Sequence, residues 1–379
     1  MLIHPEYWKS LRSRYEESRP RRMLALDGGG IRGLITLGIL ERIETLVKQR
    51  TGQPLCEYFD YIAGTSTGAI IAAGLARGMC VADLIDFYKS AGEQMFEPSC
   101  LMQRIKYFYT ADPLQKKLQE VFGIDRTLEP DNLKCLLLVV AKNVTTDSPW
   151  PISSNPDAKY NAPDRKDCNL KIPLWQLVRA STAAPVYFPP EILQWDKDDP
   201  GKTFVFVDGG VTPHNNPAFL LYRMATEPAY RLNWPIGEKK MLIISVGTGA
   251  SESMGATAGA PNKNIASTVA GLPGELMYGI QVEQDINCRT IGRCTHGALL
   301  DREIQDLIPA PSDDDLGRHF LYARYNADLS RSGLFKLGFQ SVDPGTIQKM
   351  DAVANIPVLT DIGRAAGEAA DPAHFGTFL

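Results

Sequence analysis

Apolar and polar residues form two recurring patterns along the chain. Short apolar runs predict buried strands, because a strand covered on both faces has few polar positions. Such strands are expected at residues 23–27, 58–64, 135–143, 204–208 and 241–246, and the alternating segment 319–329 adds one more. Between them, apolar residues recur at helical spacing. Helices are expected at residues 6–17, 34–48, 68–76, 81–91, 112–123, 173–182, 265–307 and 350–370.

Strands and helices alternate from residue 23 to about residue 250, which predicts an α/β fold with a mostly parallel central sheet and helices on both faces. No linker interrupts the pattern, and the Gly/Ala/Ser-rich segment 247–264 is expected to be a surface loop. We therefore expect a polar lead-in (1–22) and one domain (23–379). Within that domain, the catalytic motifs occupy 23–250 and a helical elaboration occupies 265–379.

Composition narrows the class of protein. The 379 residues are 44% apolar and carry a formal net charge of −4, so no basic field favours a nucleic-acid partner. Seven cysteines without a CxxC pair argue against a disulfide framework or a zinc site and favour a reducing compartment. We expect no signal peptide and no membrane-spanning helix, since no apolar run is long enough. These features together predict a cytoplasmic protein.

The stretch YIAGTSTGAIIAAG places Ser66 between Gly64 and Gly68, where an apolar strand gives way to a helix. This is the setting of a nucleophile elbow, a sharp turn that exposes a serine oxygen at a helix N-terminus. Small neighbours are needed because other backbone passes close by, and the helix dipole favours negative charge at that point. A serine in an ordinary turn is the alternative reading.

A glycine-rich turn, LDGGGIRG, follows the first expected strand. Adjacent glycines can aim several N–H groups into one concavity, as an acyl-transfer enzyme needs for its oxyanion. The same letters fit the GxGxxG dinucleotide fingerprint, which also needs an acidic residue at the end of the next strand. Asp60 stands near the beginning of that strand instead. Arg32 in this turn either anchors a phosphate or carboxylate or caps neighbouring carbonyls.

A nucleophilic serine needs a base. Among the five histidines, His296 and His319 stand late enough for the chain order of an α/β-hydrolase triad, but neither lies in a distinctive loop after a strand. Asp208 ends the apolar strand FVFVD and precedes Gly209 and Gly210, at a strand end of the kind where active sites of open sheets gather. Burial and a hydrogen bond to the serine would strengthen this carboxylate as a base.

Taken in order, five motifs resemble the patatin-like phospholipase family: DGGGIRG (27–33), GTSTG (64–68), RASTAAPVYFPP (179–190), DGG (208–210) and ISVGTG (244–249). The resemblance implies a patatin-like three-layer fold and a Ser-Asp dyad, with Ser66 as nucleophile and Asp208 as base. It further implies an oxyanion loop and motif glycines, namely Gly28, Gly29, Gly30 and Arg32 in the loop, and Gly33, Gly64, Gly68, Gly209 and Gly210. No cofactor or metal is expected, because no His/Asp/Glu cluster has ligand spacing.

The expected activity is that of a serine lipid acyl hydrolase of the phospholipase A type. Its substrate would be membrane phospholipids, reached from the cytoplasm by transient association with the inner face of the membrane. The apolar segments 95–109 and 184–190 are expected either to line an acyl channel or to pack as ordinary core. An esterase or thioesterase acting on small soluble esters, and a non-catalytic lipid-binding protein, remain alternatives.

Regulation is a further hypothesis, because the family resemblance extends to bacterial antiviral effectors that cyclic nucleotides switch on. The segments 247–264 and 265–307 and the C-terminal tail would form a homo-oligomer interface or a regulatory pocket for a small anionic nucleotide. Four basic residues are either its charge partners or a solvated helix face: Lys263, Arg289, Arg293 and Arg302.

Overall fold

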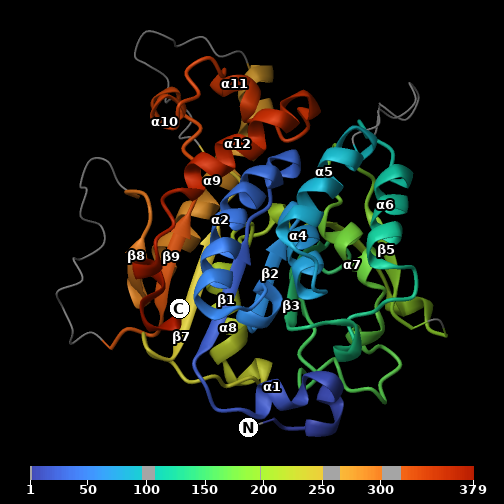
Figure 1. Cartoon of the computed structure of the whole chain (residues 1–379). Helices are drawn as coiled ribbons and strands as arrows, with labels where there is room; N and C mark the ends of the chain where they lie inside the picture. Colours follow the sequence, from blue (N-terminus) through green and yellow to red (C-terminus); the bar gives the residue numbers. More distant parts are fainter. Residues whose placement is uncertain (1, 96–106, 197, 251–264, 301–316) are drawn as a thin grey trace.

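A computed structural model of the chain describes residues 2–95, 107–196, 198–250, 265–300 and 317–379 (Figure 1). Within these residues one nine-stranded sheet has the order β5-β6-β3-β2-β1-β7-β9-β8, and β4 pairs with β3 beside this path. Its strands are β1 (Arg21–Leu26), β2 (Tyr61–Thr65), β3 (Leu136–Asn143), β4 (Ser148–Ser153), β5 (Glu191–Gln194), β6 (Thr203–Asp208), β7 (Met241–Val246), β8 (Arg293–His296) and β9 (Leu321–Tyr325).

Five of the strand pairings are parallel, and they join β3, β2, β1, β7, β9 and β8. The pairings of β3 with β4, of β3 with β6 and of β5 with β6 are antiparallel. The mostly parallel sheet expected from the sequence is therefore confirmed, with an antiparallel region on the β3 side.

Helices cover both faces of this sheet. They are α1 (Arg12–Glu16), α2 (Gly33–Thr51), α3 (Leu55–Tyr58), α4 (Thr67–Ala76), α5 (Val81–Met95), α6 (Asp112–Phe122), α7 (Leu174–Ser181), α8 (Ala218–Thr226), α9 (Ile265–Ile291), α10 (Arg331–Lys336), α11 (Pro344–Ile347) and α12 (Ile356–Gly367). Short 3₁₀ turns join them, including η1 (Pro5–Leu11), η2 (Gly30–Arg32) and η7 (Gly209–Val211).

The two faces of the sheet hold separate cores, because successive side chains of a strand point to opposite sides. Leu24 and Leu26 of β1 join a cluster with residues of α2, α4, α5, α7 and α12, and α2 and α4 stand in front of the strands in Figure 1. Met23 and Ala25 join the other cluster with α8 and with Trp8 of the N-terminal segment. The three-layer arrangement implied by the family resemblance is thus confirmed.

The structure corrects several of the elements expected from the sequence. Residues 55–58 form the short helix α3, so the second strand begins at Tyr61 and not at residue 58. The expected helix 265–307 ends at Ile291 and is followed by β8, which lies at the edge of the sheet and has no fully buried residue. A short edge strand of this kind gives little hydrophobic signal. Most of the expected loop 247–264, and residues 301–307, lie outside the described residues.

Candidate active site

The serine stands on a strained turn between β2 and α4. Ser66 has φ 55° and ψ −123°, a conformation that costs a non-glycine residue about 1–3 kcal/mol and persists only where the surroundings enforce it. Its N–H donates to Ser181 Oγ at 2.9 Å, and that hydroxyl donates to the Val140 carbonyl at 2.6 Å. A Cβ on Gly64 would lie 2.1 Å from the Gly68 carbonyl oxygen, and one on Gly68 would lie 2.2 Å from the Leu26 carbonyl oxygen, so both flanking positions accept only glycine.

Ser66 and Asp208 form a direct hydrogen bond. Ser66 Oγ donates to Asp208 Oδ2 at 2.6 Å, and the Gly210 N–H donates to Asp208 Oδ1 at 2.6 Å. The aspartate is only 5% exposed, and burial raises its pKa from the usual 3.8 to about 6, even though both hydrogen bonds favour the ionised form. Asp208 is therefore a stronger base than a free carboxylate and is still mostly ionised at pH 7.

The meeting of these residues follows from the strand register. β4 pairs with residues 138–143 of β3, and β2 pairs with residues 136–140. Because both pair with residues 138–140, β2 and β4 must lie on opposite sides of β3. β6 pairs with residues 141–143, which also pair with β4, so β6 lies on the same side of β3 as β2 and continues in line with it. Because β6 is antiparallel to β3, the carboxyl ends of β2 and β6 face each other. Asp208 lies at a strand end, as expected from the sequence, but its strand β6 runs antiparallel to β3.

The glycine loop lies against this pair and is braced at most of its polar groups. The Gly28 N–H donates to the Asn215 carbonyl at 3.1 Å, so in this structure it is already engaged. Gly29 and Gly30 line the cavity beside Ser66, and their N–H groups have no acceptor within the described part of the chain. The positive φ of Gly30, 61°, suits the glycine found there.

Arg32 is a structural cap in this site. Its Nε donates to the Gly29 carbonyl at 3.4 Å and its guanidinium donates to the Gly249 carbonyl at 3.1 Å. Burial lowers the pKa of Arg32 to about 10, which leaves it charged at neutral pH. Of the two roles open at the sequence level, the carbonyl-capping one is observed, and it fixes the loop from behind. Gly33 follows directly, and its hydrogen atom faces Thr67 Oγ1 where a Cβ would lie at 2.4 Å.

An apolar cavity of about 240 Å³ opens at the serine. Residues 184–188 form one wall, and the backbone of Phe108 and Tyr109 pairs with that of Val186 and Tyr187. The remaining lining comes from Gly29, Gly30, Ser66, Thr67, Ile70, Tyr88, Leu114, Thr182, Asp208, Gly210, Val211, Asn215, Met277 and Met350. Segment 184–188 therefore lines a cavity, whereas residues 96–106 of the other expected channel segment lie outside the described residues.

Neither candidate histidine reaches the serine. His296 ends β8, four strand spacings or roughly 19 Å from β2, and stacks on His374 with ring centroids 4.4 Å apart. His319 precedes β9 at the amino ends of the parallel strands, whereas Ser66 lies at their carboxyl ends, and its Nδ1 lies 2.7 Å from the Tyr222 hydroxyl. His296 is the last residue of β8 and, as expected, does not lie in a loop after a strand. His214 lies nearer, with its carbonyl accepting from Thr65 Oγ1, and burial lowers its pKa to about 4.

The basic residues considered for an anionic ligand have other roles. Arg289 is buried and forms a bidentate ion pair with Asp285, with N–O distances of 2.8 and 2.9 Å, so it is neither a solvated residue nor an unpaired cation. Arg293 pairs with Glu238. Lys263 and Arg302 lie outside the described residues. Among those residues no group of three His, Cys, Asp or Glu side chains is placed to hold a metal ion.

Sequence reasoning missed four residues that support the site. Ser181 and Thr248 stand in motifs that were recognised without a role for these side chains, and Asn215 stands in an unremarked loop. Thr248 Oγ1 donates to the Gly28 carbonyl at 3.0 Å. Arg324 forms a buried ion pair with Asp27, the first residue of the glycine motif. In the sequence, Arg324 is distinguished only as a charged residue inside an otherwise apolar strand.

Comparison with known proteins agrees with this geometry. Residues 24–222 match the family described as patatin-like phospholipase, which is more than half of the chain. The chain belongs to the patatin-like phospholipase family. Membership assigns it to a family of hydrolases, and the matched region contains Ser66, Asp208 and the glycine loop.

Three relatives illustrate the range of the family. The chain is 34% identical over 213 residues to a cGAMP-activated phospholipase of Vibrio cholerae, 30% over 251 residues to Patatin-17 of Solanum cardiophyllum, and 31% over 233 residues to an intracellular phospholipase A2 of Caenorhabditis elegans. The alignments cover 52%, 62% and 60% of this chain but 56%, 62% and 19% of the relatives. The chain therefore spans under two thirds of each relative's length. No helix in the described residues is long and apolar enough to cross a membrane.

Proposed function

We propose that the protein hydrolyses fatty-acyl esters of membrane phospholipids through a dyad of Ser66 and Asp208. The observation that carries this proposal is the 2.6 Å hydrogen bond from Ser66 Oγ to a buried carboxylate whose pKa is raised to about 6. The family membership and the apolar cavity at the serine support a lipid substrate. The relatives named as phospholipases support the same reaction class.

In the first half of the reaction, Ser66 Oγ attacks the ester carbonyl carbon while its proton passes to Asp208 Oδ2. The carbonyl oxygen becomes an oxyanion, for which the N–H groups of Gly29 and Gly30 are the donors in reach of the cavity. Such donors act on charge that exists only in the transition state, and one of them is typically worth about 3 kcal/mol. Collapse expels the alcohol half of the lipid, which takes the proton back from Asp208.

In the second half, water attacks the acyl-serine carbonyl and gives a proton to Asp208. The new tetrahedral species expels Ser66 Oγ, which recovers that proton, and a fatty acid leaves. One carboxylate thus serves as base and then as acid in both halves, a role that requires a pKa near the working pH. No second titratable residue is needed in this scheme.

Loss of either dyad member tests this proposal. Ser66→Ala and Asp208→Ala are each expected to abolish hydrolysis of a p-nitrophenyl ester while leaving the thermal unfolding transition in place. The double variant is expected to be no worse than either single one, because the two residues act as a unit. Near-wild-type rates in Asp208→Ala, with loss in His214→Ala, would replace the dyad by a serine–histidine mechanism.

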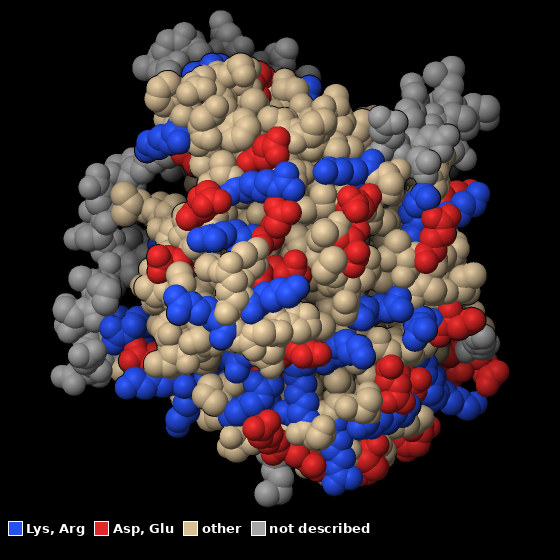
Figure 2. Space-filling model, viewed as in Figure 1, with Lys and Arg blue, Asp and Glu red and all other residues tan. Residues whose placement is uncertain are grey.

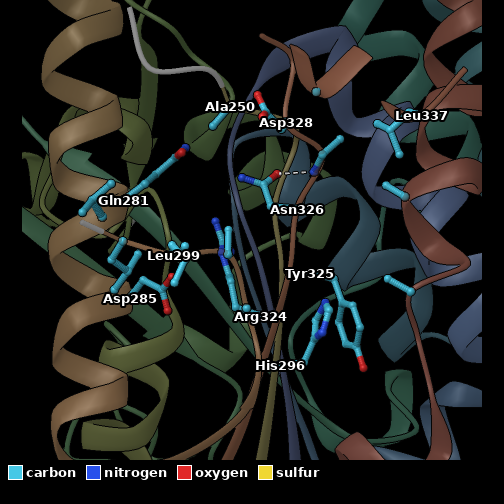
Figure 3. Close-up of a pocket in the computed structure, with 18 of the residues that line it drawn as sticks. Ala250, Gln281, Asp285, His296, Leu299, Arg324, Tyr325, Asn326, Asp328 and Leu337 are labelled. Carbon is cyan, nitrogen blue, oxygen red and sulfur yellow. Dashed lines mark hydrogen bonds between the residues drawn. The ribbon is translucent and has the colours of Figure 1, made fainter. Parts of the chain in front are cut away.

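A second proposal concerns activation by a small anionic nucleotide, as an effector of antiviral defence would need. A pocket of about 440 Å³ lies between α9, the ends of β8 and β9, α10 and α12, in the C-terminal part of the chain. Figure 3 looks into it, with Gln281 and Asp285 of α9 on one side, Arg324 at the centre, and His296 and Tyr325 on the other side. The relative named as cGAMP-activated also favours this reading.

The charged residues that line this pocket suggest how nucleotide activation can be tested. Arg324 and Lys336 are the cations of its lining, and Asp285 and Asp328 its anions. We expect a cyclic di- or trinucleotide to increase hydrolysis of phospholipid vesicles, and Lys336→Glu to remove the increase while the rate without nucleotide is kept. Equal rates with and without every member of a panel of such nucleotides would reject this activation. They would leave the hydrolase proposal standing.

A further inference from the structure

Arg324 connects the C-terminal strand to the glycine loop. It stands on β9 opposite Ser245 of β7, and its side chain crosses β7 to reach Asp27 at the end of β1. Both guanidinium nitrogens bind the carboxylate, at 2.8 and 2.5 Å, and one also donates to Ser245 Oγ at 2.7 Å. Arg324 and Asp27 are 6% and 1% exposed. Only an arginine supplies such a paired, planar contact over this reach.

Asp27 immediately precedes the glycine loop, in which Gly29 and Gly30 line the cavity beside Ser66. Its own N–H donates to the Val246 carbonyl at 3.1 Å, so the ion pair and this bond fix the point at which the chain leaves β1. A second contact, from the residue that follows β9, acts on the same loop. Asn326 Oδ1 accepts from the Gly249 N–H at 2.8 Å, and the Gly249 carbonyl accepts from Arg32. The loop is therefore held at one end by Arg324 of β9 and at the other, through Gly249, by Asn326.

A loop that offers free N–H groups to an oxyanion needs such bracing from outside itself. An N–H group that must stay free for the oxyanion cannot be fixed by a hydrogen bond to the protein. Its direction must nevertheless be set before the negative charge develops. β9 lies beyond residues 24–222, which match the family. The part of the chain outside this match thus contributes to the geometry of the catalytic loop.

We propose that Arg324 is a positioning residue for the reaction, which aims the N–H groups of the glycine loop through its ion pair with Asp27. This inference rests on the proposed hydrolase function. It also makes the second pocket relevant to catalysis, because Arg324, which lines that pocket (Figure 3), also pairs with Asp27 ahead of the loop.

The chain offers a matched control. Arg289 and Asp285 form another buried, bidentate ion pair, with N–O distances of 2.9 and 2.8 Å. Neither residue hydrogen-bonds to the glycine loop, although the charge of Asp285 acts on Asp27 and Arg324. Breaking either pair leaves a buried carboxylate without its partner, so both changes are expected to lower stability. Only the change at Arg324 is expected to affect the transition state.

The test compares Arg324→Gln and Arg324→Lys with Arg289→Gln and Arg289→Lys. Steady-state hydrolysis of a p-nitrophenyl ester and thermal unfolding are measured for each, with Ser66→Ala as the blank. We expect kcat to fall at least tenfold in Arg324→Gln with KM within twofold of wild type. Arg324→Lys should recover part of the rate, since lysine keeps the charge but not the fork. The Arg289 variants should lose melting temperature while keeping kcat within twofold.

Each outcome separates the inference from the proposed function. A wild-type rate equal to that of Ser66→Ala would reject the hydrolase proposal itself. A normal kcat in folded Arg324→Lys and Arg324→Gln, or an equal fall in kcat in the Arg289 variants, would reject the positioning role alone. If Arg324→Gln does not fold, Arg324→Lys decides: the role requires that its kcat fall below that of Arg289→Lys with KM retained.

Discussion

At the scale of single residues, the titration of Asp208 governs the proposed chemistry. The base must be ionised to accept the Ser66 proton, and burial raises its pKa from 3.8 to about 6. Activity is therefore expected to be lost as the pH falls through about 6 and to reach a plateau above 7. A pH profile of kcat/KM on a p-nitrophenyl ester measures this, since it reports the free enzyme. A midpoint near 4 would mean that Asp208 titrates as an ordinary surface carboxylate.

Gly29 allows a second prediction at this scale. A Cβ at this position would lie 2.2 Å from Thr248 Oγ1, so an alanine must move the loop or displace Thr248 from the Gly28 carbonyl. We expect Gly29→Ala to lower kcat by about 10²–10³, the usual cost of a lost oxyanion donor. Vesicle binding in a sedimentation assay should be unchanged. Equal losses in binding and turnover would instead indicate a general disruption of the loop.

Single residues also show what the sequence could and could not reveal. Ser66 and Asp208 stand in local motifs whose glycines are required by close backbone contacts, so their positions could be predicted. Arg324, Ser181 and Asn215 act through contacts over 100 residues or more of sequence, with Asp27, Ser66 and Gly28 respectively. Nothing in their neighbourhood in the chain indicates these partners. The same holds for Gly28, whose N–H is engaged only because Asn215 lies against it.

At the scale of elements, the site depends on two strands that meet end to end beside β3. The apolar runs predicted β2 and β6, but the direction of β6 depends on its register with residues 141–143, which no local pattern contains. The strands β4, β5 and β8 were not predicted for a related reason. They lie at the margins of the sheet and bury few side chains; β5 and β8 have four residues each, and β4 includes Pro149 and Pro151.

The rim of the cavity leads to a prediction about membranes. Phe108 is 48% exposed and packs edge-on against Tyr187 of the cavity wall, while Val186 holds a strained positive φ of 74° and is also exposed. An exposed apolar rim around a lipid-binding cavity would insert into a bilayer surface. Phe108→Asp is therefore expected to weaken binding to phospholipid vesicles by at least tenfold, since burying a phenylalanine contributes about 2 kcal/mol.

The matched control is Ile236→Asp, which changes a residue of 43% exposure before β7, at the amino ends of the parallel strands and away from the cavity. It should leave vesicle binding unchanged. Hydrolysis of a soluble p-nitrophenyl ester should be the same in both variants and in wild type. Equal vesicle binding by all three proteins would show that the rim does not dock on membranes.

At the scale of the whole molecule, both signs of charge are interspersed over the face shown in Figure 2, in keeping with a net charge of −4. The fold class and the order of most elements could be predicted because burial on both faces of a parallel sheet leaves long apolar runs. In the C-terminal part, the sequence predicted the strand at 319–329 and helices, but not where that strand joins the sheet. The contribution of this part to the glycine loop arises from packing of β9 against β7, which is a property of the assembled sheet.

The most direct test of the account is mass spectrometry of phospholipid vesicles after incubation with wild-type, Ser66→Ala and Asp208→Asn protein. The account predicts that wild-type protein releases free fatty acid and lysophospholipid in equal amounts, and that neither variant releases them above the blank. The same products from Ser66→Ala, at a rate near that of wild type, would contradict the claim that this serine and its buried aspartate cleave the lipid.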